Sequence, residues 1–242
     1  MKKINLSLLL CLSPIFAEDY WQQFVSYKMD VQLDTANHTI GGHSTISYKN
    51  NSPDTLYHFY LNLYANAFQE GTVKYREYSA GLGRTYRGAR IKKGIGPFFS
   101  KYEINNFIIK SGASALSDTF KIDDTILSAK LSKGLQPGAT MVIDLDWTHH
   151  VGEFLERAGR VGVQYNFAQW YPRVVVYDEN GWFNEPFHAE GEFYGEFGNY
   201  EVTMNVPRGY IIGSTGTVTN GDPGWEEVRV DTSQNFSQWL KG

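Results

Sequence analysis

The chain has 242 residues, a formal net charge of −4 at pH 7 and a single cysteine. The length is enough for one large β domain or two small ones. The mildly acidic balance argues against nucleic acid as the main partner, because proteins that bind nucleic acid concentrate positive charge. Aromatic residues make up 15% of the sequence, and this excess favours sheets over helices.

The first seventeen residues have the pattern of a cleaved secretory signal peptide. Lysines at positions 2 and 3 precede an apolar run at residues 4–12, and Ala17 is a small residue ahead of the expected cut. This run is too short to cross a bilayer core, which takes about 20 residues, and no later stretch is apolar enough to be a membrane span. The only cysteine, Cys11, lies in this segment, so the mature protein is expected to lack disulfides. We therefore predict a periplasmic or secreted protein.

Alternation of apolar and polar residues predicts a succession of strands after this segment. Residues 29–34 and 39–49 read as a hairpin, and residues 55–63 as a third strand. Further strands are expected at 103–110, 119–131, 140–149 and 199–206, with a strand buried on both faces at 173–178. The pattern indicates an all-β sandwich of many short strands joined by turns.

Two segments between these strands are not expected to form strands. Residues 153–158 are expected to form a short helix. Residues 81–96 hold five glycines and five basic side chains, which indicate a long exposed loop. Flexible backbone amides together with arginines would also suit an anionic ligand, although a solvated loop is the simpler interpretation.

A series of short motifs runs through the second half of the chain. Residues 168–173 read Ala-Gln-Trp-Tyr-Pro-Arg, residues 191–207 end on a Val-Pro pair, and residues 216–220 follow as Gly-Thr-Val-Thr-Asn. Earlier, a Leu-Asn-Leu strand at 61–63 follows a hairpin with a Gly-Gly centre. The order and spacing of these motifs, over about residues 20–220, resemble the N-terminal domain of the aminopeptidase N family of zinc metallopeptidases.

The resemblance implies a saddle-shaped β-sandwich of mostly antiparallel strands over residues 18–220. In the family this domain packs against a thermolysin-like catalytic domain, and members remove N-terminal residues from peptides. They use zinc held by the two histidines of H-E-x-x-H and a downstream glutamate. The six histidines of this chain, at positions 38, 43, 58, 149, 150 and 188, offer no such pair. No catalytic residue and no metal ligand is therefore assigned, and residues 221–242 are expected to be a linker or the start of a missing catalytic domain.

The tripeptide Gln164-Tyr165-Asn166 stands where the family's N-terminal domain extends one loop to the substrate. The resemblance implies that Gln164 and Asn166 are substrate-binding residues. Family members usually have Glu or Gln at the third position of this tripeptide. Asn166 is shorter and neutral, so it can hydrogen-bond to an ammonium group but cannot form an ion pair with it. This departure bears on how strictly the protein would select a free peptide N-terminus.

Other polar groupings have a functional and a simpler interpretation. The histidines of His149-His150 would point to opposite faces of a strand, so they could not easily bind one metal ion. His188, Glu190 and Glu192 would share one face of an extended segment as possible metal ligands. The glutamates at 190, 192 and 196 would offer the two carboxyls of a glycosidase. We favour structural or solvated roles for all of these side chains.

Large aromatic residues raise an alternative function, a non-catalytic glycan- or peptide-binding module. Trp147, Trp170, Tyr171 and Trp182 would form a platform for sugar rings if they were exposed together. Packing in the core or at a domain interface is the favoured interpretation, because large aromatic side chains dominate buried energetics. The sequence thus predicts first the scaffold and substrate-side domain of an exported zinc aminopeptidase, and second a binding module.

Overall fold

The computed structural model describes residues 20–81, 100–153 and 157–226. The predicted signal peptide at 1–17 lies outside these residues. So do most of the glycine-rich stretch at 81–96, the centre of the helix predicted at 153–158, and residues 227–242 of the predicted linker. In the described part of the chain, no helix is both long enough and apolar enough to cross a membrane.

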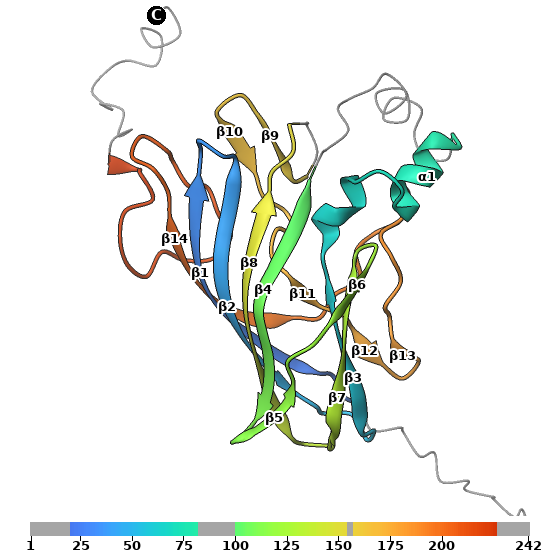
Figure 1. The fold of residues 1–242 in the computed structure, drawn as a ribbon. Coiled ribbons are helices and arrows are strands. Elements are labelled where there is room, and N and C mark those ends of the chain that lie inside the picture. Colours follow the sequence, from blue (N-terminus) through green and yellow to red (C-terminus); the bar gives the residue numbers. More distant parts are fainter. Residues whose placement is uncertain (1–19, 82–99, 154–156, 227–242) are drawn as a thin grey trace, which may run out of the picture.

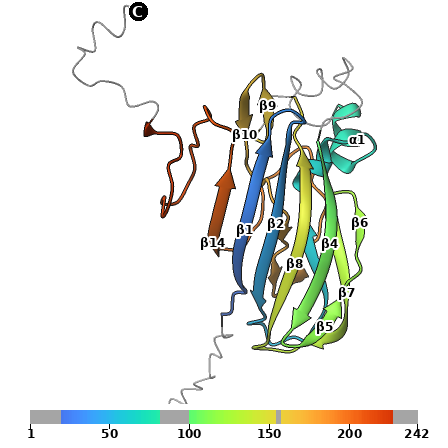
Figure 2. The same cartoon turned by 60° about the vertical axis from the view of Figure 1, so that its left-hand side comes forward.

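Two sheets form the body of the molecule (Figures 1 and 2). The larger has six strands in the order β14 (Gly198–Asn205), β1 (Phe24–Asp34), β2 (Thr39–Lys49), β8 (Thr140–His150), β4 (Lys101–Ser111) and β5 (Ser114–Ser117). The smaller has four, in the order β11 (Arg173–Val174), β3 (Leu56–Asn62), β7 (Ile126–Leu135) and β6 (Lys121–Asp123). The pairs are antiparallel except for β14, which runs parallel to β1.

Shorter elements are attached to these sheets. They are the hairpins β9 (Gly159–Val161) with β10 (Gln164–Asn166) and β12 (Tyr177–Asp178) with β13 (Gly181–Trp182), the 3-10 helix η1 (Tyr64–Phe68) and the helix α1 (Val73–Ser79). Helix α1 begins where the Thr72 side chain accepts a hydrogen bond from the Tyr75 amide, as an N-cap residue does.

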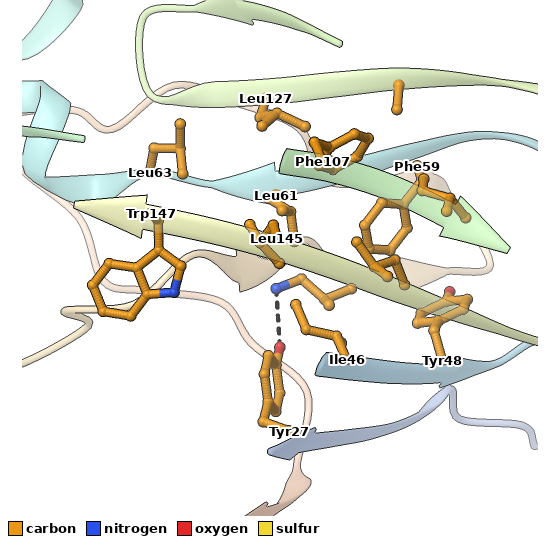
Figure 3. Packing of buried hydrophobic residues seen from close by; sticks show 14 of the residues in the cluster. Tyr27, Ile46, Tyr48, Phe59, Leu61, Leu63, Phe107, Leu127, Leu145 and Trp147 are labelled. Atoms are coloured by element: carbon orange, nitrogen blue, oxygen red, sulfur yellow. Dashed lines mark hydrogen bonds between the residues drawn. The ribbon is translucent and has the colours of Figure 1, made fainter. Parts of the chain in front are cut away.

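The core lies between the two sheets and follows from the alternation in the sequence. Along β8 the apolar side chains from Met141 to Trp147 are all buried, whereas the intervening residues face outward. They meet Phe59, Leu61 and Leu127 from the smaller sheet in one cluster (Figure 3). Full burial of each such side chain contributes about 1.5–3 kcal/mol relative to exposure. The prediction of an all-β sandwich is confirmed, as are the first hairpin and the strand at 140–149.

A close approach explains one glycine of the Gly-Gly pair in β2. Gly42 lies opposite Trp147 of β8. A Cβ atom at Gly42 would lie 2.5 Å from Trp147 Cζ2 and 2.9 Å from Val31 Cγ1. The absence of a side chain therefore lets the indole lie flat across β2, where its Nε1 donates a 2.8 Å hydrogen bond to Ser44 Oγ.

Two predicted strands are wrong in extent. The strand predicted at 119–131 is divided into β6 and β7 by a turn at Asp124, whose φ of +53° breaks the extended backbone. Of residues 173–178 only Val174, Val175 and Val176 are buried, and the segment forms β11 and β12 rather than one strand. The backbone changes partner in between, because the Val175 amide donates to Tyr60 of β3 while the Val176 carbonyl accepts from Phe183, which follows β13.

Candidate functional site

The predicted substrate-binding tripeptide forms strand β10 of a small hairpin. Gln164 pairs with Val161 of β9, and Asn166 pairs with Gly159. The turn between the strands contains Gly162, whose φ of +57° suits glycine. The hairpin stands at the end of the larger sheet, beside the turn that joins β1 to β2 (Figure 1). The structure thus places Gln164 and Asn166 on an exposed projection rather than in the core.

Tyr165 anchors this hairpin to the sandwich. Its hydroxyl lies 2.6 Å from Nδ1 of His38, a residue of the β1–β2 turn with a φ of +54°. The turn is itself fixed, because the His38 carbonyl accepts a hydrogen bond from the Val151 amide, at 2.9 Å. The Tyr165 ring also packs against Phe167. Its partial removal from water raises the pKa of the Tyr165 hydroxyl, which is therefore protonated and able to donate at neutral pH.

Gln164 and Asn166 lie on the other face of the hairpin. Residues i and i+2 of a strand share one face, and Gln164 Nε2 donates a 3.2 Å hydrogen bond to Asn166 Oδ1. Within residues 20–81, 100–153 and 157–226, no other side chain hydrogen-bonds to either amide. Gln164 Oε1 can therefore accept from a ligand, and Asn166 Nδ2 can donate to one. This pair of neutral dipoles suits the N–H and C=O groups of a peptide end.

The base of the hairpin carries an ion pair on the Tyr165 face, opposite to the two amides, because Arg160 is paired with Tyr165. Arg160 of β9 lies 3.0 Å from Glu153, and the Arg160 amide donates to the Gly152 carbonyl at 2.9 Å. The guanidinium is mostly shielded from water, whereas the carboxylate is exposed. The pair fixes the strand that carries Gly159, the residue opposite Asn166.

The two adjacent histidines behave as predicted. His149 is buried and shares a 2.8 Å hydrogen bond with Ser100 Oγ. His150 points to the opposite face, 3.1 Å from Glu103. Burial lowers the pKa of His149 to about 3, so its imidazole is neutral near pH 7. The two imidazoles thus lie on opposite faces of β8, as the strand period predicts, and His149 has a partner inside the fold.

The acidic segment after β13 does not assemble a metal site either. His188 pairs with Glu77 of α1 at 2.6 Å, and Glu192 pairs with Arg157 at 3.2 Å, so these two candidate ligands have different partners. Glu196 accepts a 2.6 Å hydrogen bond from Gln22. Among the described residues, no group of three His, Cys, Asp or Glu side chains could hold a metal ion. The described part of the chain therefore does not fit a catalytic zinc.

The four aromatic residues considered as a platform for sugars do not form one. Trp147 is buried in the core, and Trp170 packs against it with ring centroids 5.8 Å apart. Tyr171 packs on Tyr27, 5.3 Å away. Trp182 instead contacts rings of the smaller sheet, Phe59 and Tyr60 among them. The interpretation that these rings pack internally is confirmed.

Comparison with known proteins gives matches to solved structures only. No protein-family model matches the chain, and no curated sequence matches it significantly. The solved structures that it resembles include M1 zinc metallopeptidases.

One of these structures, a mutant M1 zinc metallopeptidase from Deinococcus radiodurans, has a TM-score of 0.38 and 11% identity and covers 77% of this chain. Another, a mutant from the same organism bound to a Tyr-Ser-Ala substrate, has a TM-score of 0.37 and 11% identity and covers 81%. A third, also from Deinococcus radiodurans, has a TM-score of 0.37 and 10% identity and covers 82%. This chain spans about a third of the length of each, 33–37%. The resemblance seen in the sequence motifs is to the same family of proteins.

The sequence did not indicate the residue that positions the candidate site. His38 and Tyr165 are 127 positions apart, and nothing in the sequence links the two. The available signal was the strand period, which places the side chain between Gln164 and Asn166 on the face opposite to them. That period predicts an inward-facing Tyr165, but not its partner.

Proposed function

We propose that this chain is the substrate-side scaffold domain of an exported zinc aminopeptidase-like metallopeptidase. In this proposal residues 1–17 are a signal peptide, residues 18–220 are the N-terminal β-sandwich domain, and residues 221–242 lead toward a catalytic domain. The zinc and the groups that hydrolyse the peptide bond are supplied by residues outside this chain. The protein acts in the periplasm or outside the cell.

The observation that carries the proposal is the geometry of the β9–β10 hairpin. The motif order in the sequence resembles the aminopeptidase N family, in which this tripeptide contacts substrate. The hairpin presents Gln164 and Asn166 together on an accessible face, and Tyr165 secures it from behind through His38. A rigidly held pair of hydrogen-bonding groups orients a ligand at low entropic cost.

The chemistry of the pair indicates what it would bind. Gln164 Oε1 would accept a hydrogen bond from the N-terminal ammonium of a peptide, and Asn166 Nδ2 would donate to a carbonyl oxygen near that end. Neither group carries charge, so a peptide with a blocked N-terminus would lose one hydrogen bond rather than an ion pair. Such a bond contributes about 0.5–1.5 kcal/mol, or more when one partner is charged. Selection for a free N-terminus at this position would therefore be moderate.

Zinc content and peptidase activity of the purified chain test the proposal that the catalytic residues lie outside it. Purified protein should retain no stoichiometric zinc after dialysis against zinc-containing buffer, as measured by elemental analysis. It should release no product from aminoacyl-p-nitroanilides with or without added zinc. Robust zinc-dependent release that co-purifies with the chain would contradict the proposal, because it would place the catalytic site within these residues.

A peptide comparison tests the substrate side of the proposal. Trialanine with a free N-terminus should bind more tightly than N-acetyl-trialanine, by several-fold, in calorimetric or fluorescence titrations. Equal affinity of the two peptides would show that the chain does not recognise the N-terminus.

A further inference from the structure

A hollow of about 830 Å³ lies on the outer face of the smaller sheet, away from the β9–β10 hairpin. We call it the outer trough. A row of residues paired across three strands forms its floor: Tyr60 of β3 lies opposite Ser128 of β7, which lies opposite Lys121 of β6. Phe59 and Leu61, the chain neighbours of Tyr60, point into the core, so Tyr60 faces the trough. Its volume is in the usual range for small-molecule sites.

Two irregular segments wall the outer trough. Residues 69–73 and Arg76, from the end of η1 into α1, form one wall. Asn184 and Pro186, from the segment after β13, form part of the lining as well. The first wall is fastened to the sheet, because Asp124 Oδ2 accepts a 2.7 Å hydrogen bond from the Val73 amide. Parts of the chain that are far apart in the sequence thus form the trough, and the hydrogen bond between Asp124 and Val73 fixes one wall.

Two buried polar atoms of the lining residues lack hydrogen-bond partners. They are the hydroxyl of Tyr102, a residue that is 5% exposed, and Oδ1 of Asp124. The Tyr102 ring packs in the core against Trp147 and His149. Buried polar atoms in folded proteins are nearly always paired, so an orphaned one calls for an explanation. Both atoms are shielded from solvent, so a ligand in the trough would reach them only if the lining moved.

The charge of the lining argues for an uncharged ligand. Lys121 and Arg76 partly offset the carboxylates of Glu70, Asp123 and Asp124, so a ligand of either sign would meet both attraction and repulsion. The lining also contains the side-chain amides of Gln69 and Asn184 and the hydroxyls of Ser128 and Tyr60, which donate and accept without net charge. Asn66 and Thr72 also line the trough, but their side chains are buried and hydrogen-bonded within the chain. A molecule with many hydroxyl groups would satisfy such a surface best.

The shape of the floor favours a sugar over a peptide. Tyr60 offers a half-buried ring that also contacts His58 and Trp182. Aromatic rings present a flat apolar surface with a polar edge, which complements the C–H face of a sugar ring. A peptide would instead pair with the free edge of a strand. The edge strand here, β6, has only three residues, which leaves little backbone to pair.

We propose that the outer trough binds a neutral carbohydrate, with one sugar ring stacked on Tyr60. Hydroxyls of the same ligand pair with Asp123 and Asn184 along the sides of the trough. This site is separate from the hairpin of the proposed function and does not depend on it. It also differs from the four internal aromatic residues that the sequence suggested as a platform.

Three neutral trisaccharides, namely maltotriose, cellotriose and chitotriose, serve as probes in calorimetric and NMR titrations of the whole chain. At least one should bind at millimolar concentration or below. Tyr60→Ala should weaken that binding about tenfold or more, whereas Tyr60→Phe should retain most of it. Tyr57→Ala is the matched control, because Tyr57 is on the same strand, is exposed and does not line the trough. It should leave the affinity unchanged.

Asp123→Asn is a second variant, and it should not disturb the packing of the core. Asp123 is exposed on β6, and its replacement should weaken binding several-fold with an unchanged unfolding midpoint. The proposal is overturned if none of the three trisaccharides binds, or if the Tyr60 and Asp123 variants bind as well as the original protein. It is also overturned if trialanine occupies the trough in competition with the sugar, since the site would then recognise peptide.

Discussion

The six-stranded sheet and the segment from residue 159 to residue 197 are built in different ways. In the sheet, β1, β2, β4 and β8 are each 11 residues long and pair over most of their length. From residue 159 to residue 197, strands have only two or three residues. Single hydrogen bonds to residues far away in the sequence attach this irregular region to the sheets. The long strands bury most of the core, and the irregular region carries the exposed amides of Gln164 and Asn166.

Two such contacts join the regions. Tyr27 of β1 accepts a 3.0 Å hydrogen bond from the Val174 amide of β11, drawn as the dashed line in Figure 3. Tyr165 of β10 is hydrogen-bonded to His38 of the β1–β2 turn. Loops positioned by a rigid scaffold commonly carry function, and here single tyrosines provide the positioning. Changes in the sheet should therefore affect global stability, and changes at these tyrosines should affect the irregular region more locally.

The largest expected effect comes from Gly42→Ala in the centre of the sheet. The new methyl group would collide with Trp147 and Val31, and overpacking of this kind costs about 3 kcal/mol at the upper end of its usual range. The control is Gly41→Ala, whose Cβ would lie 3.9 Å from the nearest atom. Urea unfolding should show a large decrease in the free energy of unfolding for Gly42→Ala and a small decrease for Gly41→Ala. Similar losses in both would contradict the assigned packing.

Acidification should weaken the sheet through His149. Burial lowers its pKa to about 3 in the folded state, against about 6.5 in the unfolded chain. The unfolded state therefore binds the proton first, and stability that is complete above pH 6.5 is lost as the pH falls toward 3. The expected loss is about 2 kcal/mol at pH 5 relative to pH 7.5. The unfolding free energy should differ less between the two pH values in His149→Gln than in the original protein. If His149→Gln lost as much stability between the two pH values as the original protein, other groups would cause the pH dependence.

Tyr27→Phe should loosen the junction between the two regions. It leaves the buried Val174 amide without its acceptor, at a cost of about 1.5 kcal/mol. The exposed Tyr57→Phe serves as control. Hydrogen exchange should quicken most at residues 173–176, and a uniform change over the whole sheet would show that the bond does not specifically hold β11.

Tyr165→Phe should have the smallest effect on stability and the most local one. Loss of the hydrogen bond to His38 is expected to cost about 1 kcal/mol, confined to opening of the β9–β10 hairpin. Amide exchange in β10 should accelerate about fivefold while the midpoint of global unfolding changes little. Tyr194→Phe, which removes a hydrogen bond to Asp178 elsewhere in the irregular region, should leave β10 unchanged.

The same contrast explains what could be predicted from the sequence. The period-2 pattern of β8 specifies the face that is buried, so the sandwich and its first hairpin follow from it. The parallel pairing of β14 with β1 does not, because the two strands are far apart in the chain and alternation carries no information on partners. The division at Asp124 does not follow from the sequence, because one aspartate in the left-handed region interrupts a stretch that otherwise has the pattern of a strand. Gln164 and Asn166 were found only through the resemblance, and His38 was not found, because its role depends on a distant tyrosine.

The central claim is that the β9–β10 hairpin contacts the free end of a peptide. NMR titration of the isotope-labelled chain with trialanine tests it most directly. The account predicts shifts at the Gln164 and Asn166 side-chain amides, and weaker binding in Gln164→Ala and Asn166→Ala. It predicts no change in the controls Gln32→Ala and Asn199→Ala, which alter exposed residues of β1 and β14. The claim would be contradicted if trialanine shifted resonances elsewhere but not those of the hairpin. It would also be contradicted if Gln164→Ala and Asn166→Ala bound trialanine as tightly as the original protein.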